Sequence, residues 1–461
     1  MISRRLAKRI LDVLLKSGGS FSEIYIQKKI SNTVKLENSR IESSISGFEL
    51  GCGLRICFDD GTFYAFVDSL DKESLLNAAR TLSLAVDKSS GGKVLDLTSQ
   101  KSPYKVKIKK YPSTVIPEYK RNLLVDVDQA SRNYSSYIIQ VTSNLSDSEE
   151  EIYIANSDEV LCFHKIVRTL LTVDVVARRG KDTRTGYKSL AKTCGYEIFD
   201  SISPNDIALK ASRIAVNMLD AVNAPVGSLP VVIAPGFGGV IFHEACGHGL
   251  EADAILKEAS VFKGMIGKKI ASEIITVIDD PTLTSHWGSF KFDDEGFASR
   301  QTVLIRDGVL ESYMYDLKSA RKLQEHKTAN GRRQSYRHIP LPRMTNTYIN
   351  KGDSDPHTII KSIKKGLYAK EFAGGQVDPA TGDFVFGISE GYLIENGNIC
   401  EPVKGATLIG NGPKVLKKIE AIGDDLDFAP GFCGKNGQTV PNEVGQPTIL
   451  VSELTVGGTG I

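Results

Sequence analysis

Residues 229–253 read LPVVIAPGFGGVIFHEACGHGLEAD, an apolar run followed by a glycine-rich turn and two histidines. The run over 231–234 is short and apolar, which favours a buried strand. The glycines of 236–239 predict a turn, because glycine adopts backbone angles that other residues avoid. We expect a helix after this turn, carrying His243, Glu244 and His248.

This triad of side chains has the chemistry of a catalytic zinc site. Such a site typically has three protein ligands and an open position for water. His243 and His248 offer imidazoles, and Glu244 can take the proton of an attacking water. The histidines are five residues apart, whereas the usual zinc motif has them four apart. The pattern predicts a metallopeptidase.

The spacing of five has a structural consequence. At roughly 100° per residue, a regular α-helix would turn the two rings about 140° apart. We therefore expect a wide or broken turn over 245–249, with i→i+5 bonding of the π type. Gly247 and Gly249 supply the backbone freedom for it.

Other interpretations of this stretch are weaker. The sequence pattern alone does not identify the third metal ligand. Two histidines could have this spacing by chance. The glycines could cradle a phosphate, but no Gly-Lys-Ser/Thr follows and the spacing is not GxGxxG. The candidate third ligands are Glu251, Asp253, Cys246, His286, His338 and Cys433.

Hydrophobic periodicity predicts an α+β fold in two domains. In residues 1–222 we expect an antiparallel sheet with helices, from β-like runs at 23–28, 33–36, 54–58, 137–141 and 152–154 and helical patterns at 71–86 and 117–132. Ser203 and Pro204 mark a further helix start, and the connector at 223–230 marks the boundary. Residues 223–461 should be mainly antiparallel β and carry the metal-binding helix, because Asp307-Gly308 and Asn396-Gly397 signal hairpins.

The amino-acid composition limits the possible binding partners and the cellular compartment of the protein. The 461 residues carry a formal net charge of +2, so no nucleic-acid partner is implied. The seven scattered cysteines favour a reducing compartment. With no long apolar run and no signal peptide, we expect a cytoplasmic protein without a membrane span. The basic run KVKIKK over 105–110 alternates with apolar residues, and we interpret it as an edge strand.

Longer motifs resemble one family. The sequence is similar to the TldD/PmbA family of metallopeptidases, in particular its TldD-like branch, over nearly the whole chain. The segments that carry this resemblance are HEACGHGLEAD (243–253), DDPTL (279–283), GSFKFDDEG (288–296), NGRRQSYRHIPLPRMTNTYI (330–349), GGQVDPATGDFVFGISEGYLIENG (374–397), PVKGATLIGNGPKVL (402–416) and CGKNGQTVPNEVGQPTILVSELTVGGTG (433–460).

The resemblance implies a function and a site. It implies a zinc peptidase of unstructured peptides or peptide precursors, with one Zn²⁺ per chain held by His243, His248 and Cys433. Glu244 would then be the general base. It also implies a two-subunit assembly, either with a PmbA-like subunit or as a homodimer.

Further polar residues are candidates around the site. Arg332, Arg333, Tyr336, Arg337 and His338 could contact substrate or the oxyanion, or could belong to a surface loop or a partner contact. Glu251 and Asp253 could orient a ligand histidine, or simply lie on a helix surface. The run at 293–295, DDE, could bind cations, but a solvated turn before Gly296 is favoured.

Two other functions compete with peptidase. A structural zinc protein would have four protein ligands and no open position, and Glu244 would then have no purpose. A regulatory subunit, as in the PmbA-like branch, would be expected to lack the motif. The intact His-Glu…His motif argues against both.

Overall fold

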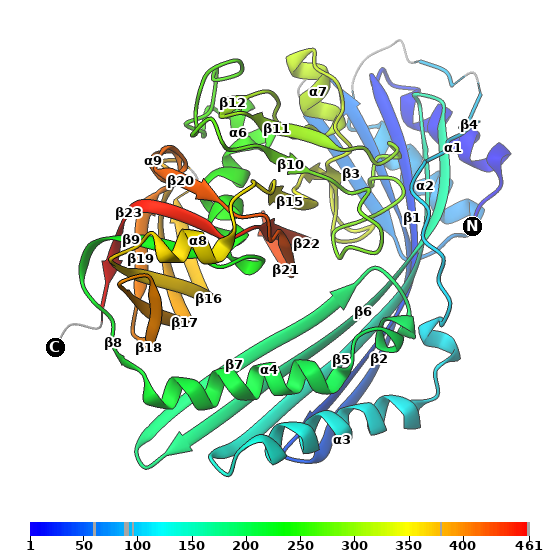
Figure 1. Cartoon of the computed structure of the whole chain (residues 1–461). Coiled ribbons are helices and arrows are strands. Elements are labelled where there is room, and N and C mark those ends of the chain that lie inside the picture. Colours follow the sequence, from blue (N-terminus) through cyan, green and yellow to red (C-terminus); the bar gives the residue numbers. More distant parts are fainter. Residues whose placement is uncertain (59–60, 87–91, 95, 379, 459–461) are drawn as a thin grey trace.

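A long twisted sheet organises the first half of the chain. The computed structural model describes residues 1–58, 61–86, 92–94, 96–378 and 380–458 (Figure 1). The sheet has the order β3-β2-β1-β5-β6-β4, and β7 also pairs with β6; only β4 runs parallel to its neighbour. Its strands are β1 (Phe21–Glu37), β2 (Arg40–Phe58), β3 (Gly61–Val67), β4 (Thr98–Ser99), β5 (Ile138–Asn156), β6 (Val160–Arg179) and β7 (Asp182–Lys192).

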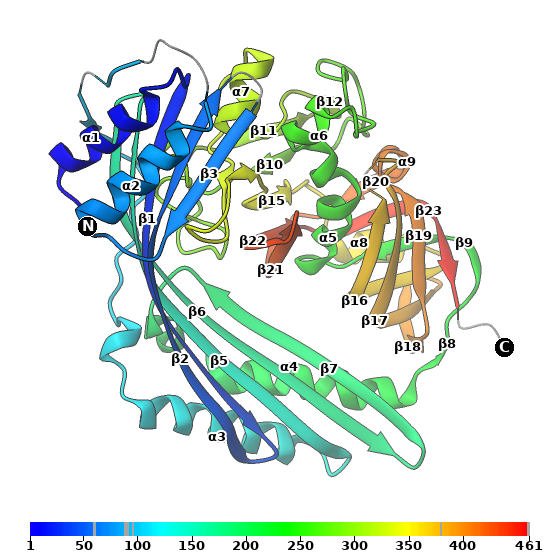
Figure 2. The ribbon, with the colours of Figure 1, turned by 180° about the vertical axis from the view of Figure 1, so that it is seen from behind.

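Four helices cover one side of this sheet. Helices α1 (Arg4–Leu15) and α2 (Lys72–Ser83) cover one end, and α3 (Pro117–Tyr134) and α4 (Pro204–Asn217) lie along the other (Figures 1 and 2). Side chains alternate between the faces of a strand. Ile24 and Ile26 therefore pack under α1 and α2, whereas Tyr25 faces the C-terminal half.

The C-terminal half contains a small barrel and a second sheet. Five strands pair in a closed ring, in the order β16-β9-β23-β19-β17 and back to β16. The ring strands are β9 (Gly227–Ile233), β16 (Lys365–Asp378), β17 (Asp383–Glu395), β19 (Thr407–Asn411) and β23 (Ile449–Gly457), extended by β8 (Val222–Asn223), β18 (Asn398–Lys404) and β20 (Ile419–Ile422).

The second sheet carries the ribbon next to the candidate site. Its order is β12-β11-β10-β15-β22-β21, so β21 is an edge strand. The strands are β10 (Val277–Asp279), β11 (Thr302–Arg306), β12 (Val309–Leu310), β15 (Asn346–Ile349), β21 (Asp427–Lys435) and β22 (Gln438–Gln446); β13 (Gly331–Arg332) and β14 (Leu341–Pro342) pair separately. The helices are α5 (Val240–Phe242), α6 (Ala252–Leu256), α7 (Leu317–Leu323), α8 (Pro356–Lys361) and α9 (Gly412–Lys417).

The α+β class is confirmed, but several expected elements differ. The runs at 23–28 and 33–36 belong to the single strand β1, and those at 137–141 and 152–154 to β5. Cross-strand pairing continues through the polar residues between these runs. The basic run at 105–110 forms no strand. The sequence Asp59-Asp60-Gly61 also predicts a turn, and residues 59–60 of it lie outside the described residues. The two-domain division at 222/223 stays a prediction.

No helix in the described part of the chain is long and apolar enough to cross a membrane.

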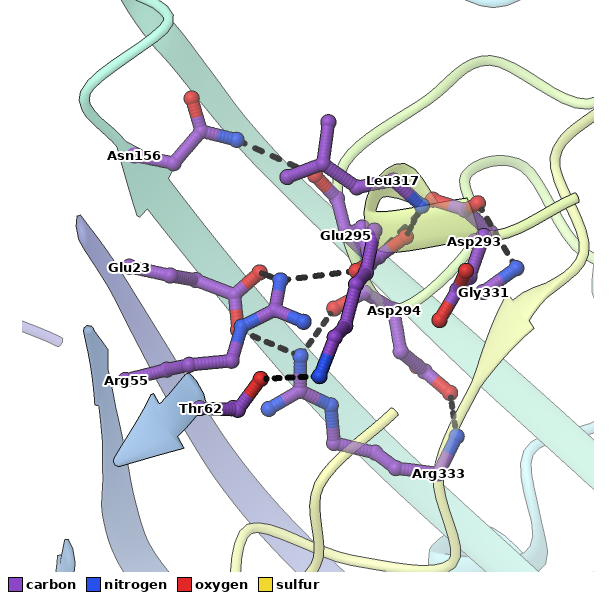
Figure 3. Close-up of polar contacts among 12 residues, drawn as sticks. Glu23, Arg55, Thr62, Asn156, Asp293, Asp294, Glu295, Leu317, Gly331 and Arg333 are labelled. Atoms are coloured by element: carbon purple, nitrogen blue, oxygen red, sulfur yellow. Dashed lines mark hydrogen bonds and ion pairs between the residues drawn. The ribbon is translucent and has the colours of Figure 1, made fainter. Parts of the chain in front are cut away.

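A buried charged joint connects the two halves (Figure 3). Arg55 on β2 lies 2.6 Å from Glu23 on β1 and 2.8 Å from Glu295 in the C-terminal half. Arg333 binds Glu23 at 2.5 Å and the Asp294 carbonyl at 2.7 Å. The run at 293–295 does form a turn before Gly296, with the Gly296 N–H donating to the Asp293 carbonyl at 3.1 Å. The solvation favoured for it is wrong, because Asp293 and Glu295 are buried between the halves.

The joint predicts a pH dependence of stability. Burial raises the pKa of Glu295 to about 7 from an ordinary 4.5, although Arg55 opposes this shift and Asp316 and Glu23 add to it. The folded state then binds more protons than the unfolded state, so the free energy of unfolding falls as pH rises from about 4.5 to about 7. We expect the wild-type thermal midpoint to fall more across this range than that of Glu295→Gln.

Thermal denaturation at several pH values, with the exposed Glu420→Gln as a matched control, measures this difference. The control should follow wild type. The same pH slope in wild type and Glu295→Gln would contradict the prediction.

Candidate metal centre

A single turn of π-helix carries the two histidines. After α5 the backbone widens over His243–Gly247, and the His248 N–H donates to the His243 carbonyl, an i→i+5 bond. A 3₁₀ turn over His248–Leu250 follows. The expected wide turn is confirmed, and it brings the two imidazole centroids to 5.1 Å, with the ring planes at 83°.

Two glycines explain why the chain can fold this way. Gly236 has φ of 82°, which L side chains rarely adopt, so the turn from β9 into the helix needs glycine there. Gly247 lies against Met344, and a Cβ at this position would meet the Met344 sulfur at 2.3 Å. The π-turn therefore packs closely on the chain around β15.

The third member of the group comes from the edge strand β21. The Cys433 Sγ lies 3.5 Å from His248 Nε2. One ligand atom from each of His243, His248 and Cys433 lies within 4.8 Å of the others. Glu244 Oε2 is 3.8 Å from His248 Nε2, and the Glu244 side chain is 33% exposed, so this carboxylate is open to solvent beside the group.

The far side of His248 is fixed by a chain of charges. Its Nδ1 lies 2.8 Å from Oε2 of the fully buried Glu251. Lys435 Nζ donates to Glu251 at 2.8 Å, to Asp253 at 2.5 Å and to the Pro342 carbonyl at 3.2 Å, which uses all three protons of its ammonium. This chain leaves His248 Nε2 directed at Cys433.

The titrating groups respond to one another strongly. Burial lowers the pKa of His248, but the Glu251 carboxylate and Cys433 together outweigh burial and hold this pKa well above its usual value. Burial raises the pKa of Glu251, but His248 and Lys435 bring it to about 2. Burial also raises the pKa of Cys433, yet His243 and His248 lower it to about 5. The thiol therefore favours its anionic form, the form that binds metals.

The other candidate third ligands lie elsewhere. Cys246 packs in the hydrophobic core, and burial raises its pKa. His286 Nδ1 contacts Glu443 at 2.6 Å, and His338 Nδ1 contacts the Ser335 hydroxyl at 2.9 Å. Glu251 and Asp253 contact Lys435. Within the described ranges, the metal-ligand group consists of His243, His248 and Cys433.

The polar cluster at 332–338 is not brought to this group. Arg332 donates to the Met344 and Pro441 carbonyls, both at 2.6 Å, and Arg333 belongs to the charged joint. The Tyr336 hydroxyl and the Arg337 guanidinium both bind Asp68 in the N-terminal half. Arg333, Tyr336 and Arg337 thus join the halves of the protein, whereas Arg332 and His338 bind within the C-terminal half. These contacts lend no support to the prediction that the cluster contacts substrate.

Three residues around the group were not predicted. Lys435 is two residues after Cys433 on a strand and shares its face, a periodicity that could have identified it. The Asn442 side-chain amide lies 3.2 Å from His243 Nδ1, and Arg343 donates to the Cys433 carbonyl. Asn442 could have been found from Asn436-Gly437, a hairpin signal that sets the β21–β22 register.

Comparison with known protein families identifies the family of this chain. The chain matches the PmbA/TldA metallopeptidase domain 1 over residues 22–86, the central domain over 110–219 and the C-terminal domain over 226–458. The chain belongs to the PmbA/TldD family of metallopeptidases.

Individual relatives agree with this family over the full length. A "Metalloprotease TldD homolog" of Haemophilus influenzae is 38% identical, with 99% of this chain and 97% of the relative covered. A "Zinc metalloprotease TldD homolog" of Saccharolobus solfataricus is 30% identical, with 96% and 97% covered. The crystal structure of TldE from Thermococcus kodakarensis has the same fold, with a TM-score of 0.79, 19% identity and 99% of both chains covered.

Proposed function

We propose that the protein is a zinc-dependent peptidase in which His243, His248 and Cys433 hold one Zn²⁺ and Glu244 is the general base. The observation that carries this proposal is the convergence of two imidazoles and a thiol beside a partly exposed carboxylate. These donors suit zinc, and three protein ligands are typical of a catalytic site. A structural site would call for a fourth protein ligand.

The side chains around the metal-ligand group have distinct roles in the proposed reaction. Bound zinc would acidify a water molecule and polarise the scissile carbonyl. Glu244, the acceptor exposed to solvent, takes the proton of the attacking water and passes it to the leaving amine. Glu251 and Lys435 hold the His248 ring in one orientation, which keeps its Nε2 free for the metal.

An unstructured peptide is the substrate that this geometry suits. His248 and Cys433 are mostly buried, so a folded surface could not reach them, whereas an extended chain could. Cys433 lies on β21, whose outer edge has no strand partner in the described residues. A peptide added to this edge would pass beside the group and gain backbone hydrogen bonds without a strong sequence requirement.

We further propose that the protein works as a two-subunit assembly. The second subunit is either PmbA-like or another copy of this chain, and the cytoplasm is the proposed compartment. The assembly rests on family membership, and the compartment rests on the scattered cysteines.

The ligand assignment can be tested by metal content. Purified wild type should hold about one zinc per chain. Cys433→Ala should lose most of it, because two protein ligands bind zinc much more weakly than three. Elemental mass spectrometry measures the ratio. The matched control is Cys246→Ala, a buried thiol on the same π-turn that points into the core; zinc retained in Cys433→Ala and lost in Cys246→Ala would reverse the assignment.

The general base can be tested without disturbing the metal. Glu244→Gln should keep its zinc yet lose hydrolysis of an unstructured protein such as casein by about 10²- to 10⁴-fold. The assay compares both proteins at matched metal content, with a PmbA-like subunit supplied if the chain alone is inactive. Undiminished hydrolysis by Glu244→Gln would refute the role, and zinc-loaded wild type that never hydrolyses peptides would favour a regulatory subunit.

The charge chain behind His248 gives a third prediction. Lys435→Met leaves the buried Glu251 without its ammonium partner, so we expect zinc affinity to fall about 10- to 100-fold. Competition with a chromophoric chelator measures the affinity, and the absorption bands of the Co²⁺-loaded protein report the ligand geometry. Lys418→Met removes an exposed ion pair with Glu453 and is the matched control; equal affinities in the two variants would count against the role of Lys435.

A further inference from the structure

A cavity lies between the long sheet and the C-terminal half. It has a volume of about 260 Å³. Strands β1, β5 and β6 line it on one side, and the segments at 287–294 and 332–334 and the β21–β22 ribbon line it on the other. It shares no lining residue with the metal-ligand group, Glu244, Glu251 or Lys435. It is therefore a separate site from the candidate metal centre.

The ribbon places this cavity next to the metal-ligand group. Phe432 precedes Cys433 on β21 and lies opposite Pro441 of β22. Because side chains alternate between the faces of a strand, Phe432 and Cys433 lie on opposite faces of the ribbon. Phe432 and Pro441 both line the cavity, and Phe432 is 57% exposed. The cavity thus lies on the other face of the ribbon, one residue away from the metal ligand along β21.

Arg332 brings a buried positive charge to the cavity. It is 4% exposed, and its two terminal nitrogens donate to the Met344 and Pro441 carbonyls, both at 2.6 Å. These acceptors are uncharged, and Arg332 has no ion pair in the described part of the chain. Its Nε has no hydrogen-bond partner there and is not fully enclosed by protein. Burial lowers the pKa of Arg332 to about 10; Asp294 opposes this shift and Arg168 adds to it.

Arg168 brings a second positive charge from β6. Its side chain is 11% exposed, and its ion pair with Glu150 is long, at 3.5 Å. Glu150 is shared, because it also accepts a hydrogen bond from Gln27 at 2.5 Å. The Nε of Arg168 is buried without a partner, whereas its Nη2 is not enclosed and has no hydrogen bond in the described residues. Burial lowers the pKa of Arg168, although Glu150 and Asp294 oppose this shift.

The carboxylates of the lining do not balance its positive charges. Asp147 is paired with Lys120 at 2.6 Å. Burial raises the pKa of Asp293 well above its usual value, and Glu295 adds to this shift, so Asp293 favours its neutral form. The Arg333 charge is met by Glu23. The other charged residues of the described lining are three cations and two carboxylates, namely Lys29, Arg168, Arg332, Glu150 and Asp294. One positive charge is therefore left without a counter-charge.

We propose that this cavity binds a carboxylate of the peptide substrate, held by Arg168 and Arg332; the inference rests on the function proposed above. A guanidinium offers N–H donors in a fixed geometry that matches the oxygens of a carboxylate. Buried charges are normally paired, so a bound carboxylate would remove the cost of the unbalanced charge. Arg332 then contacts substrate from the far face of the ribbon and not at the metal-ligand group.

The proposed peptide path leads past this cavity. A peptide added to the outer edge of β21 has side chains that point alternately to the two faces of the ribbon. When one residue faces the metal-ligand group, its neighbours face the side on which Phe432 lies. The carboxylate that reaches the arginines belongs either to an acidic side chain near the cleaved bond or to the C-terminus of the peptide.

Matched peptides test the proposal by hydrolysis. Within each pair the unstructured sequence is the same, with either Glu or Gln at one position near the cleaved bond, or with a free or an amidated C-terminus. Wild type should prefer the carboxylate member of at least one pair by about tenfold or more in kcat/KM, as hydrogen bonds to a charged group allow. The pair that shows the preference identifies the source of the carboxylate. Equal hydrolysis within every pair would overturn the proposal.

Variants of Arg168 locate the preference in the cavity. In Arg168→Gln the ratio within the preferred pair should fall to about one, whereas Arg168→Lys keeps the charge and should keep part of the preference. The ratio does not depend on the amount of folded enzyme, so a less stable variant still gives a result. Arg178→Gln is the matched control, an exposed arginine of β6 that does not line the cavity. An unchanged ratio in Arg168→Gln, or an equal loss in Arg178→Gln, would overturn the proposal.

Peptide binding separates this proposal from the peptidase function. Glu244→Gln prepared with zinc should bind the labelled peptides without hydrolysing them, and fluorescence anisotropy measures their affinities. The carboxylate member should bind about tenfold more tightly, and Glu244→Gln/Arg168→Gln should lose this difference. If the difference is found but wild type hydrolyses no peptide, the carboxylate site stands and the peptidase function fails. Equal affinities within every pair would overturn the carboxylate site, even if wild type hydrolyses the peptides.

Discussion

The backbone hydrogen bond from His248 to the His243 carbonyl is the constraint on which the site depends. In a regular α-helix this spacing would point the imidazoles in different directions. The i→i+5 bond instead places both on one side of the helix, facing the β21–β22 ribbon. The ribbon then contributes Cys433 to the group, Asn442 to His243 and Lys435 to the carboxylate behind His248.

The two halves of the site are thus supported in different ways. The helical half is held by close packing, with Gly247 against Met344. The ribbon half is held by charge and by hydrogen bonds, through Lys435 and through the buried Arg343, which donates to the Cys433 carbonyl. Both supports are buried, so the geometry of the group is fixed by the protein interior, while Glu244 stays accessible.

The sequence predicted features that depend on neighbouring residues, but it did not predict those that depend on contacts between residues far apart in the chain. The π-turn followed from the spacing of His243 and His248 and from arithmetic on helix geometry. Cys433 is 185 residues from His248, and no spacing rule could select it; it came from family resemblance. The burial of residues 293–295 could not be predicted locally, because the partners of this run, such as Arg55 for Glu295 and Arg333 for the Asp294 carbonyl, come from other elements. The run at 105–110 alternates as a strand does, but Val106 and Ile108 line a cavity beside β6 and the run pairs with no strand.

The distance of 185 residues between His248 and Cys433 also concerns the chain as a polymer. Any metal shared by these side chains closes a long loop, as a disulfide would, and removes conformations that the unfolded chain could otherwise visit. The entropy lost on closing a loop grows only slowly with the length of the loop. Most of the loss therefore comes from making the cross-link at all. A bound metal would therefore add to the stability of the contact between helix and ribbon, and a chelator would lower the free energy of unfolding as well as empty the site.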